Sequence, residues 1–250
     1  MCVEYSKNVL IQGKNKYEFN YDIKKVLNIG MKAIVLLKFP FDQNKEVRLS
    51  DEPVYKNNAN GHDDNIFCIE GGRLLWRIED INIHFKDIID SSKHKYGSYS
   101  DIALYKNNLY IIDYRNYTFK VNIEDGSIVG KLFQDNDLYV DEKILHFSYM
   151  IYQCQIREDT IYVVQDPFKY VINDFKYDEC RLNSNIWAIR DGKVIWKVQD
   201  YRKKYPMLPD TTFAGIHMRE NYLRAVNYNG QAYSVNFDTG EIMERLDWTK

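Results

Sequence analysis

The chain of 250 residues is long enough to bury a large core, and aromatic residues make up 15% of it, which favours sheet over helix. The formal net charge is -2, from 34 Lys and Arg against 36 Asp and Glu, so the basic excess that nucleic-acid binding requires is missing. We therefore expect a single all-β domain over residues 1–250 and no nucleic-acid partner.

Strand-like runs separated by turn residues recur through the chain. Asp-Gly and similar turns supply the positive backbone φ that a tight hairpin needs, and they mark where each hairpin reverses, at Gly72, Gly126, Gly192 and Gly240. The runs fall into four sets of four, in chain order: 26–30, 33–37, 65–69 and 73–78; 101–105, 109–113, 117–121 and 128–132; 152–156, 161–164, 186–189 and 194–198; 213–218, 222–226, 232–235 and 242–246.

This arrangement predicts a propeller-like fold of about four four-stranded blades that need not close completely. Runs such as 34–37 and 162–164 are apolar at successive positions, which is typical of strands covered on both faces. Residues 1–20 are expected to supply an edge or closing strand. A twisted β-sandwich or a stacked meander with the same hairpins is the alternative.

The segment 188–196, Ala-Ile-Arg-Asp-Gly-Lys-Val-Ile-Trp, resembles the repeat of the quinoprotein dehydrogenase-like (PQQ-like) propellers, in which a tryptophan follows the turn glycine by four residues. Gly72 and Trp76 keep that spacing, whereas Gly130 and Glu244 stand where tryptophan would be. The resemblance implies the fold and not the quinone, because this chain has neither the larger number of blades nor the export signal of such an enzyme. We expect Trp76 and Trp196 to pack between blades.

The sequence contains no catalytic motif, and we expect no enzymatic activity, no cofactor and no metal. Nucleophile elbows, phosphate-binding loops and paired histidines are missing from it. An enzyme remains possible only if distant residues converge, as His62, Asp63, Asp64 and His94 could at a loop face.

The N-terminal residues and the cysteines indicate a cytoplasmic protein. Residues 1–5 form neither a charged leader nor an apolar signal core, and no apolar run approaches the about 20 residues that span a bilayer. The cysteines lie far apart, which predicts buried free thiols: Cys2, Cys68, Cys154 and Cys180. We expect no membrane partner.

Nearly every long connection between the predicted strands belongs to one face of the propeller, and loops on a rigid scaffold commonly carry function. They are 40–64, 80–98, 134–147, 166–184 and 200–211. Two of them combine acids with aromatic side chains, as protein interfaces do. The predicted partner-binding residues are Asp135, Asp137, Tyr139, Asp141, Glu142, Phe168, Tyr170 and Tyr177.

An acidic and aromatic surface suits a basic protein partner. A small β protein of this kind is similar in type to the immunity proteins of bacterial contact-dependent growth inhibition, which neutralise toxins. We therefore predict a toxin inhibitor that occludes the active site of a basic toxin domain. The alternatives are a propeller scaffold that binds an endogenous protein or a small ligand, and an enzyme with a loop-face site.

Overall fold

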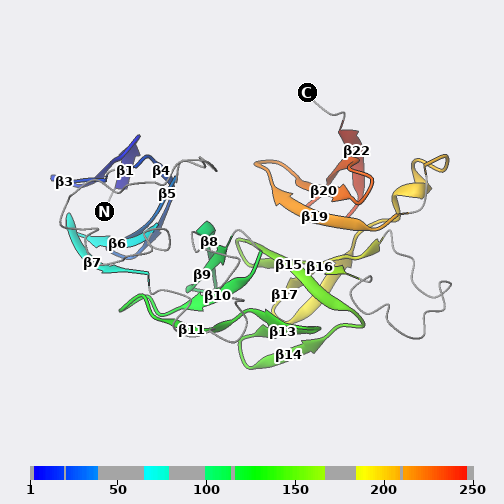
Figure 1. The fold of residues 1–250 in the computed structure, drawn as a ribbon, viewed down its shortest axis with the longest axis horizontal. Coiled ribbons are helices and arrows are strands. Elements are labelled where there is room, and N and C mark those ends of the chain that lie inside the picture. The colour runs from blue at the N-terminus through cyan, green and yellow to red at the C-terminus, as the bar shows by residue number, and fades with distance from the viewer. Residues whose placement is uncertain are drawn as a thin grey trace, which may run out of the picture. The chain divides into compact units, whose positions relative to one another are not determined.

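The computed structural model describes residues 3–19, 21–38, 65–78, 99–113, 116–166, 184–208 and 211–246. Their strands form six antiparallel sheets, and in each sheet the strands follow one another in chain order (Figure 1). Four of these sheets have four strands each, so the prediction of an all-β, propeller-like fold with four four-stranded blades is confirmed. Among the described residues, no helix has the length and apolar character needed to cross a bilayer.

The chain divides into two compact units, which we describe separately. Unit 1 contains Met1–Arg115 and Phe119–Gly130, and unit 2 contains Asn116–Thr118 and Lys131–Lys250. This division groups residues by the contacts within each unit and does not test whether the two units form one domain. The single domain expected over residues 1–250 therefore stays a prediction.

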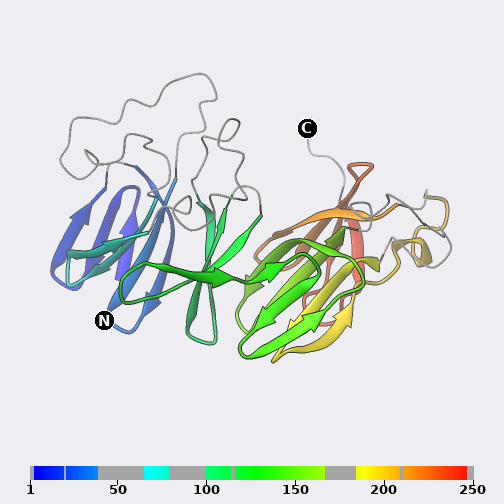
Figure 2. The same cartoon turned by 60° about the horizontal axis from the view of Figure 1, so that its bottom comes forward.

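Each unit contributes one three-stranded sheet followed by two four-stranded sheets (Figures 1 and 2). The strands of the first three sheets are β1 (Val3–Ser6), β2 (Val9–Gln12) and β3 (Asn15–Glu18); β4 (Ile23–Ile29), β5 (Lys32–Leu37), β6 (Ile66–Glu70) and β7 (Arg73–Arg77); β8 (Tyr99–Tyr105), β9 (Asn108–Asp113), β10 (Thr118–Val121) and β11 (Ile128–Lys131).

The other three sheets are β12 (Phe133–Gln134), β13 (Asp137–Val140) and β14 (Lys143–His146); β15 (Met150–Arg157), β16 (Thr160–Asp166), β17 (Ile186–Arg190) and β18 (Lys193–Lys197); β19 (Phe213–Met218), β20 (Leu223–Asn227), β21 (Ala232–Val235) and β22 (Ile242–Leu246). The turn glycines predicted from the sequence have positive φ: Gly72 (77°), Gly126 (78°), Gly192 (67°) and Gly240 (71°).

Two of the predictions for connecting segments are wrong. Residues 1–20 do not supply a single edge strand, because β1–β3 form a sheet of their own. Residues 134–147 are not a loop, because they contain β13, β14 and part of β12. In both cases two-residue turns let strands of four residues or fewer reverse within a short segment.

A buried tryptophan connects neighbouring four-stranded sheets, as predicted. In unit 2 the indole Nε1 of Trp196 donates to the carbonyl of Phe237 at 2.8 Å, and its ring lies against Gly240. In unit 1 the indole Nε1 of Trp76 donates to the carbonyl of Ile123 at 2.7 Å, and its ring lies against Gly126 in the same way. The glycine is needed because a Cβ would collide with the ring.

A buried asparagine makes a second connection between the same sheets. Asn185 precedes β17, and its side-chain amide donates to the carbonyls of Gln165 (2.6 Å) and Phe213 (2.8 Å), while its oxygen accepts from the Phe213 N–H. Asn65 precedes β6 and makes the equivalent bonds to Leu37 and Tyr99. Each asparagine therefore joins the second strand of one sheet to the first strand of the next.

The three-stranded sheets also match between the units. Asn8 donates from its side chain to the carbonyl of Phe19, and Asn136 donates to that of Phe147. The carbonyl of Lys7 accepts from Ile23 N–H, and that of Asp135 accepts from Ile151 N–H, at 2.7 Å in both cases. Turns, bulges and side-chain bonds thus recur at the same places in the two units, and we call this shared arrangement the common plan. It identifies which residues of the two units are equivalent.

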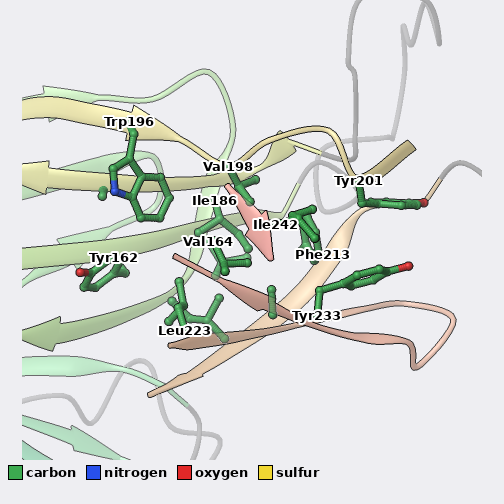
Figure 3. Packing of buried hydrophobic residues seen from close by; sticks show 14 residues of the cluster. Tyr162, Val164, Ile186, Trp196, Val198, Tyr201, Phe213, Leu223, Tyr233 and Ile242 are labelled. Atoms are coloured by element: carbon green, nitrogen blue, oxygen red, sulfur yellow. The ribbon is translucent and has the colours of Figure 1, made fainter. Parts of the chain in front are cut away.

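The largest described core cluster of unit 2 lies between its two four-stranded sheets. Trp196 and Tyr162 lie at one end of it, and Tyr201, Phe213 and Tyr233 at the other (Figure 3). Burial in such clusters is what the apolar strands of the sequence predict. Cys68 and Cys154 are buried free thiols, as predicted; burial raises the pKa of Cys68 to about 12 and that of Cys154 well above its ordinary value. Cys2 and Cys180 lie outside the described residues.

The outer edge of β22 is bonded by side chains from the segment before β19, which includes the short 3₁₀ turn η4 (Tyr201–Lys203). The N–H of Ile242 donates to the Gln199 side chain at 3.1 Å, and the N–H of Arg245 donates to the Tyr205 hydroxyl at 2.8 Å. The Lys204 ammonium donates to the carbonyls of Ile242 and Met243. These side chains form hydrogen bonds with backbone groups of β22 that could otherwise pair with another strand.

Gly240→Ala is expected to lower the free energy of unfolding by about 3 kcal/mol, in part because a left-handed φ costs a side chain about 1–2 kcal/mol. A Cβ at Gly240 would also lie 2.5 Å from the rigid ring of Trp196. Gly192→Ala is the control, since its φ is similar but its Cβ would meet only the flexible side chain of Lys143, at 2.9 Å. Urea unfolding measures both, and equal losses would contradict the role of the ring.

Candidate protein-binding surface

The sheet β12–β14 carries five of the predicted partner-binding residues. Successive strand residues point to opposite faces, and in β13 Leu138 (0% exposed) and Val140 (1%) are buried while Asp137 and Tyr139 are partly exposed. One face of this sheet therefore packs against the rest of unit 2, and Asp137 and Tyr139 lie on the other face.

Contacts with the sheet β15–β18 fix the inner face. The side chain of Lys143 lies against Gly192, and its ammonium donates to the carbonyl of Asp191 at 3.4 Å. At the other end of β14, the ring of Phe147 meets the ring of Trp187 edge-on, with centroids 6.0 Å apart. Lys143 is thus directed toward the β17–β18 turn and not toward the outer face.

Two cross-strand pairs form the outer face. Tyr139 pairs with Ile144, and Asp137 pairs with His146, whose Nδ1 lies 2.6 Å from Asp137 Oδ1. Ile144 keeps 52% of its surface exposed. The centre of the face is therefore apolar and aromatic.

The acids lie in or beside the two turns of the sheet. Asp135 begins the β12–β13 turn with φ 53°, and Asp141 begins the β13–β14 turn with φ 55°. The first turn lies beside the start of β15, since Asp135 accepts from Ile151 N–H, and the second lies beside the β17–β18 turn, which Lys143 contacts. The two turns are about 13 Å apart, the length of the four residues of β13 at about 3.3 Å each.

This placement differs from the single acidic loop that the sequence suggested. Asp135 and Asp137 lie at one end of β13, and Asp141 and Glu142 lie at the other. We call Asp135, Asp137, Tyr139, Asp141, Glu142 and Ile144 the β13 surface. It has an apolar centre with acids at both ends.

The fold does not require these acids. Under the common plan, the positions of Asp135, Asp137, Asp141 and Glu142 are occupied in unit 1 by Lys7, Val9, Gly13 and Lys14, in turns of the same length and with φ of 51° at Lys7 and 61° at Gly13. Because lysine and glycine build the same turns, these turns do not depend on the acids of unit 2.

Two basic side chains, Lys131 and His146, lie close to the β13 surface. Burial lowers the pKa of Lys131, and the nearby Asp135 carboxylate acts against that shift. The His146 side chain beside Asp137 is 73% exposed, so water screens this pair.

Sequence reasoning missed Ile144 and His146, because the segment was assigned to a loop. The alternation of buried and exposed residues in 137–140 was the available signal, but it extends over one short strand. Phe168, Tyr170 and Tyr177 lie outside the described residues, as do His62, Asp63, Asp64 and His94 and nearly all of the long connections 40–64, 80–98 and 166–184.

The described part of the chain contains no group of three or more His, Cys, Asp or Glu side chains that could hold a metal ion. The arrangement at the β13 surface consists of acids at turns and an apolar pair between them. Its chemistry suits recognition of a surface that combines cationic and apolar groups.

A family model described as a domain of unknown function (DUF7957) matches residues 130–246. That stretch coincides with most of unit 2 and contains the β13 surface. No curated protein matches the chain.

Three of the solved structures that resemble the chain share little sequence identity with it. They are the computationally designed Ika8 protein (8% identity, TM-score 0.40, covering 98% of this chain and 60% of that one), the N-terminal domain of Nup159 (9%, 0.44, 98% and 57%) and the β-propeller domain of Cps50 (Swd1) from Myceliophteria thermophila (10%, 0.43, 98% and 67%). This chain thus spans about three fifths of the length of the first two. The fold assignment rests on the sheets themselves.

Proposed function

We propose that this chain is a non-catalytic protein-binding module and that unit 2 binds a basic protein through the β13 surface. In the more specific form of the proposal, the partner is a bacterial toxin domain and the chain is its immunity protein. Inhibition then follows from occlusion, because the bound chain covers the site at which the toxin holds its substrate.

The observation that carries the proposal is the pair formed by the partly exposed Tyr139 and the exposed Ile144, with acids at both ends of β13. Aromatic and apolar side chains at the centre of an interface supply most of its binding energy, and the polar rim supplies specificity. Here the apolar pair lies between two turns that carry acids.

The sign of the charge selects a basic partner. A nuclease toxin holds phosphate with lysine and arginine side chains, and Asp135, Asp137, Asp141 and Glu142 offer carboxylates to such groups. Opposite charges would speed association, and the apolar centre would slow dissociation.

The test begins with capture of the native partner and its purification, followed by binding kinetics with charge-reversed variants. Asp135→Lys and Glu142→Lys are suitable because unit 1 has Lys7 and Lys14 at the equivalent turn positions. At low salt we expect the double variant to lower the association rate constant at least about 10-fold. Glu220→Lys, in the exposed β19–β20 turn, is the matched control and is expected to leave the rate unchanged.

Removal of the aromatic anchor affects dissociation instead. Tyr139→Ala is expected to weaken binding about 30-fold through a faster dissociation rate, the usual size for an interface hot spot of about 2 kcal/mol. Unchanged kinetics in both variants would refute the β13 surface. A partner with no toxic activity, or one whose activity persists in the complex, would refute the immunity proposal and favour the scaffold alternative.

A further inference from the structure

The sheet β1–β3 of unit 1 has an exposed face that corresponds to the β13 surface of unit 2. In β2, Leu10 and Gln12 are each 1% exposed, whereas Ile11 is 41% exposed, so the strand has one buried and one outer face. Gln12 holds the buried face, because its side-chain amide donates to the carbonyls of Met31 at 3.2 Å and Ile69 at 3.3 Å. Ile11 therefore lies on the face that points away from the sheet β4–β7.

Lysines lie in the two turns at the ends of β2. Lys7 begins the β1–β2 turn with φ 51°, and Lys14 follows Gly13 in the β2–β3 turn. Both lysines are exposed, and among the described residues neither side chain makes an ion pair. The partly exposed Val9 and the exposed Ile11 lie between them on the outer face. We call Lys7, Val9, Ile11 and Lys14 the β2 surface.

Two acids on the neighbouring strands do not reverse the charge of this face. Glu18 forms an ion pair with Lys16 on the same strand, at 3.3 Å. Glu4, on β1, is then the acid set against Lys7 and Lys14. The β2 surface therefore has an apolar centre within a face that is net basic.

The β2 surface and the β13 surface occupy equivalent places in the common plan and carry opposite charges. The equivalent pairs are Lys7 and Asp135, Ile11 and Tyr139, and Lys14 and Glu142. β2 and β13 have four residues each, so the charged turns of both surfaces are about 13 Å apart. Because each surface has the same sign of charge at both ends, the charges match whether the two strands meet parallel or antiparallel.

We propose that a second copy of this chain binds through these surfaces, with the β2 surface of one molecule against the β13 surface of another. Val9 and Ile11 would cover Tyr139 and Ile144, and the turn lysines would pair with the turn acids. Two different surfaces meet in such a contact, so it is heterologous. The proposal rests on the geometry of the β13 surface and not on the toxin assignment, and a second copy and a basic partner would compete for that surface.

The first test is analytical ultracentrifugation of the full chain over a range of concentrations. Exposed ion pairs are screened by salt, so the experiment compares about 10 mM with about 0.15 M ionic strength, where the Debye length falls from about 30 Å to about 8 Å. We expect concentration-dependent association at the lower ionic strength and a shift toward the monomer at the higher. A chain that is monomeric at both would overturn the proposal.

Two double variants each reverse the charge of one surface. Lys7→Asp with Lys14→Glu makes the β2 surface acidic, and Asp135→Lys with Glu142→Lys makes the β13 surface basic. Each new residue is the one that the other unit has at the equivalent turn position, so both variants are expected to fold. We expect each to raise the dissociation constant of self-association at least about 10-fold.

The quadruple variant combines all four substitutions in one chain. Two lysines become acids and two acids become lysines, so its formal net charge stays -2 while the surfaces exchange their signs. We expect it to associate as the unchanged chain does. A quadruple variant that associates no better than the double variants would overturn the proposal, and so would unchanged association in either double variant, even if the quadruple variant does not fold.

Glu220→Lys with Glu241→Lys is the control for net charge. It changes the charge by as much as Asp135→Lys with Glu142→Lys, but its residues lie exposed beside other turns of unit 2. We expect it to keep self-association. An equal loss in this control would show that the overall charge, and not the two surfaces, governs association.

The outcome is distinguishable from that of the proposed function. Lys7→Asp with Lys14→Glu is expected to bind the captured partner as the unchanged chain does, because the proposed function uses the β13 surface alone. A monomeric chain whose partner binding still depends on Asp135 and Glu142 would refute self-association and leave the proposed function intact. Self-association that responds to these two acids, with partner binding that does not, would refute the proposed function instead.

Discussion

Trp196→Ala is expected to lower the free energy of unfolding by about 4 kcal/mol, the usual loss for a large aromatic residue of the core. The Trp196 side chain is 7% exposed, its ring lies 5.7 Å from that of Tyr162, and its indole Nε1 donates to the carbonyl of Phe237. Its removal opens a cavity between two sheets and leaves that carbonyl with only the longer bond from the Tyr162 hydroxyl, at 3.5 Å. Urea unfolding followed by circular dichroism measures the loss.

Trp187→Ala is the control for this experiment. Trp187 lies on the neighbouring strand β17, is only partly buried, and contacts the Lys197 ammonium, which lies 4.7 Å from its ring centroid. Because less apolar area is lost, we expect a cost of about 1–2 kcal/mol. A cost at Trp187 equal to that at Trp196 would show that the contacts of Trp196 with Phe237 and Gly240 cost no more to lose than the contact of Trp187 with Phe147.

Asn185→Ala is expected to cost about 3 kcal/mol, because buried backbone groups left without partners each cost about 1–3 kcal/mol. The Asn185 amide satisfies the carbonyls of Gln165 and Phe213 and the N–H of Phe213. The same urea experiment applies.

Asn136→Ala serves for comparison, since the side chain of Asn136 makes one described bond, to the carbonyl of Phe147 at 2.9 Å. A single bond of this kind is worth about 1 kcal/mol. If Asn185→Ala cost no more than Asn136→Ala, the role of Asn185 in joining the sheets would be refuted.

The four-stranded sheets could be predicted because their signals are local. Gly192 follows Asp191 between two apolar runs, and a positive φ at that turn is a property of the residues themselves. The sheet β12–β14 could not be recognised, because its strands have four residues or fewer and its turns use Asp135 and Asp141 in place of glycine. Short charged strands depend on the inner-face contacts of Lys143 and Phe147, which the sequence does not display.

The residues of the candidate site also differ in whether the sequence could predict them. Composition alone indicated the acids and Tyr139 of the β13 surface. The exposed Ile144 beside Tyr139 required the strand register, which pairs the two across β13 and β14.

The side chains that bond the outer edge of β22 bear on how this protein behaves at high concentration. An uncovered edge strand recruits strands from other molecules and begins aggregation. Gln199, Lys204 and Tyr205 already occupy amides and carbonyls of that edge, so a second molecule would have to displace them before it could add a strand. The double variant Lys204→Met with Tyr205→Phe lacks both the ammonium and the hydroxyl. We therefore expect it to be less soluble and to form β-rich oligomers.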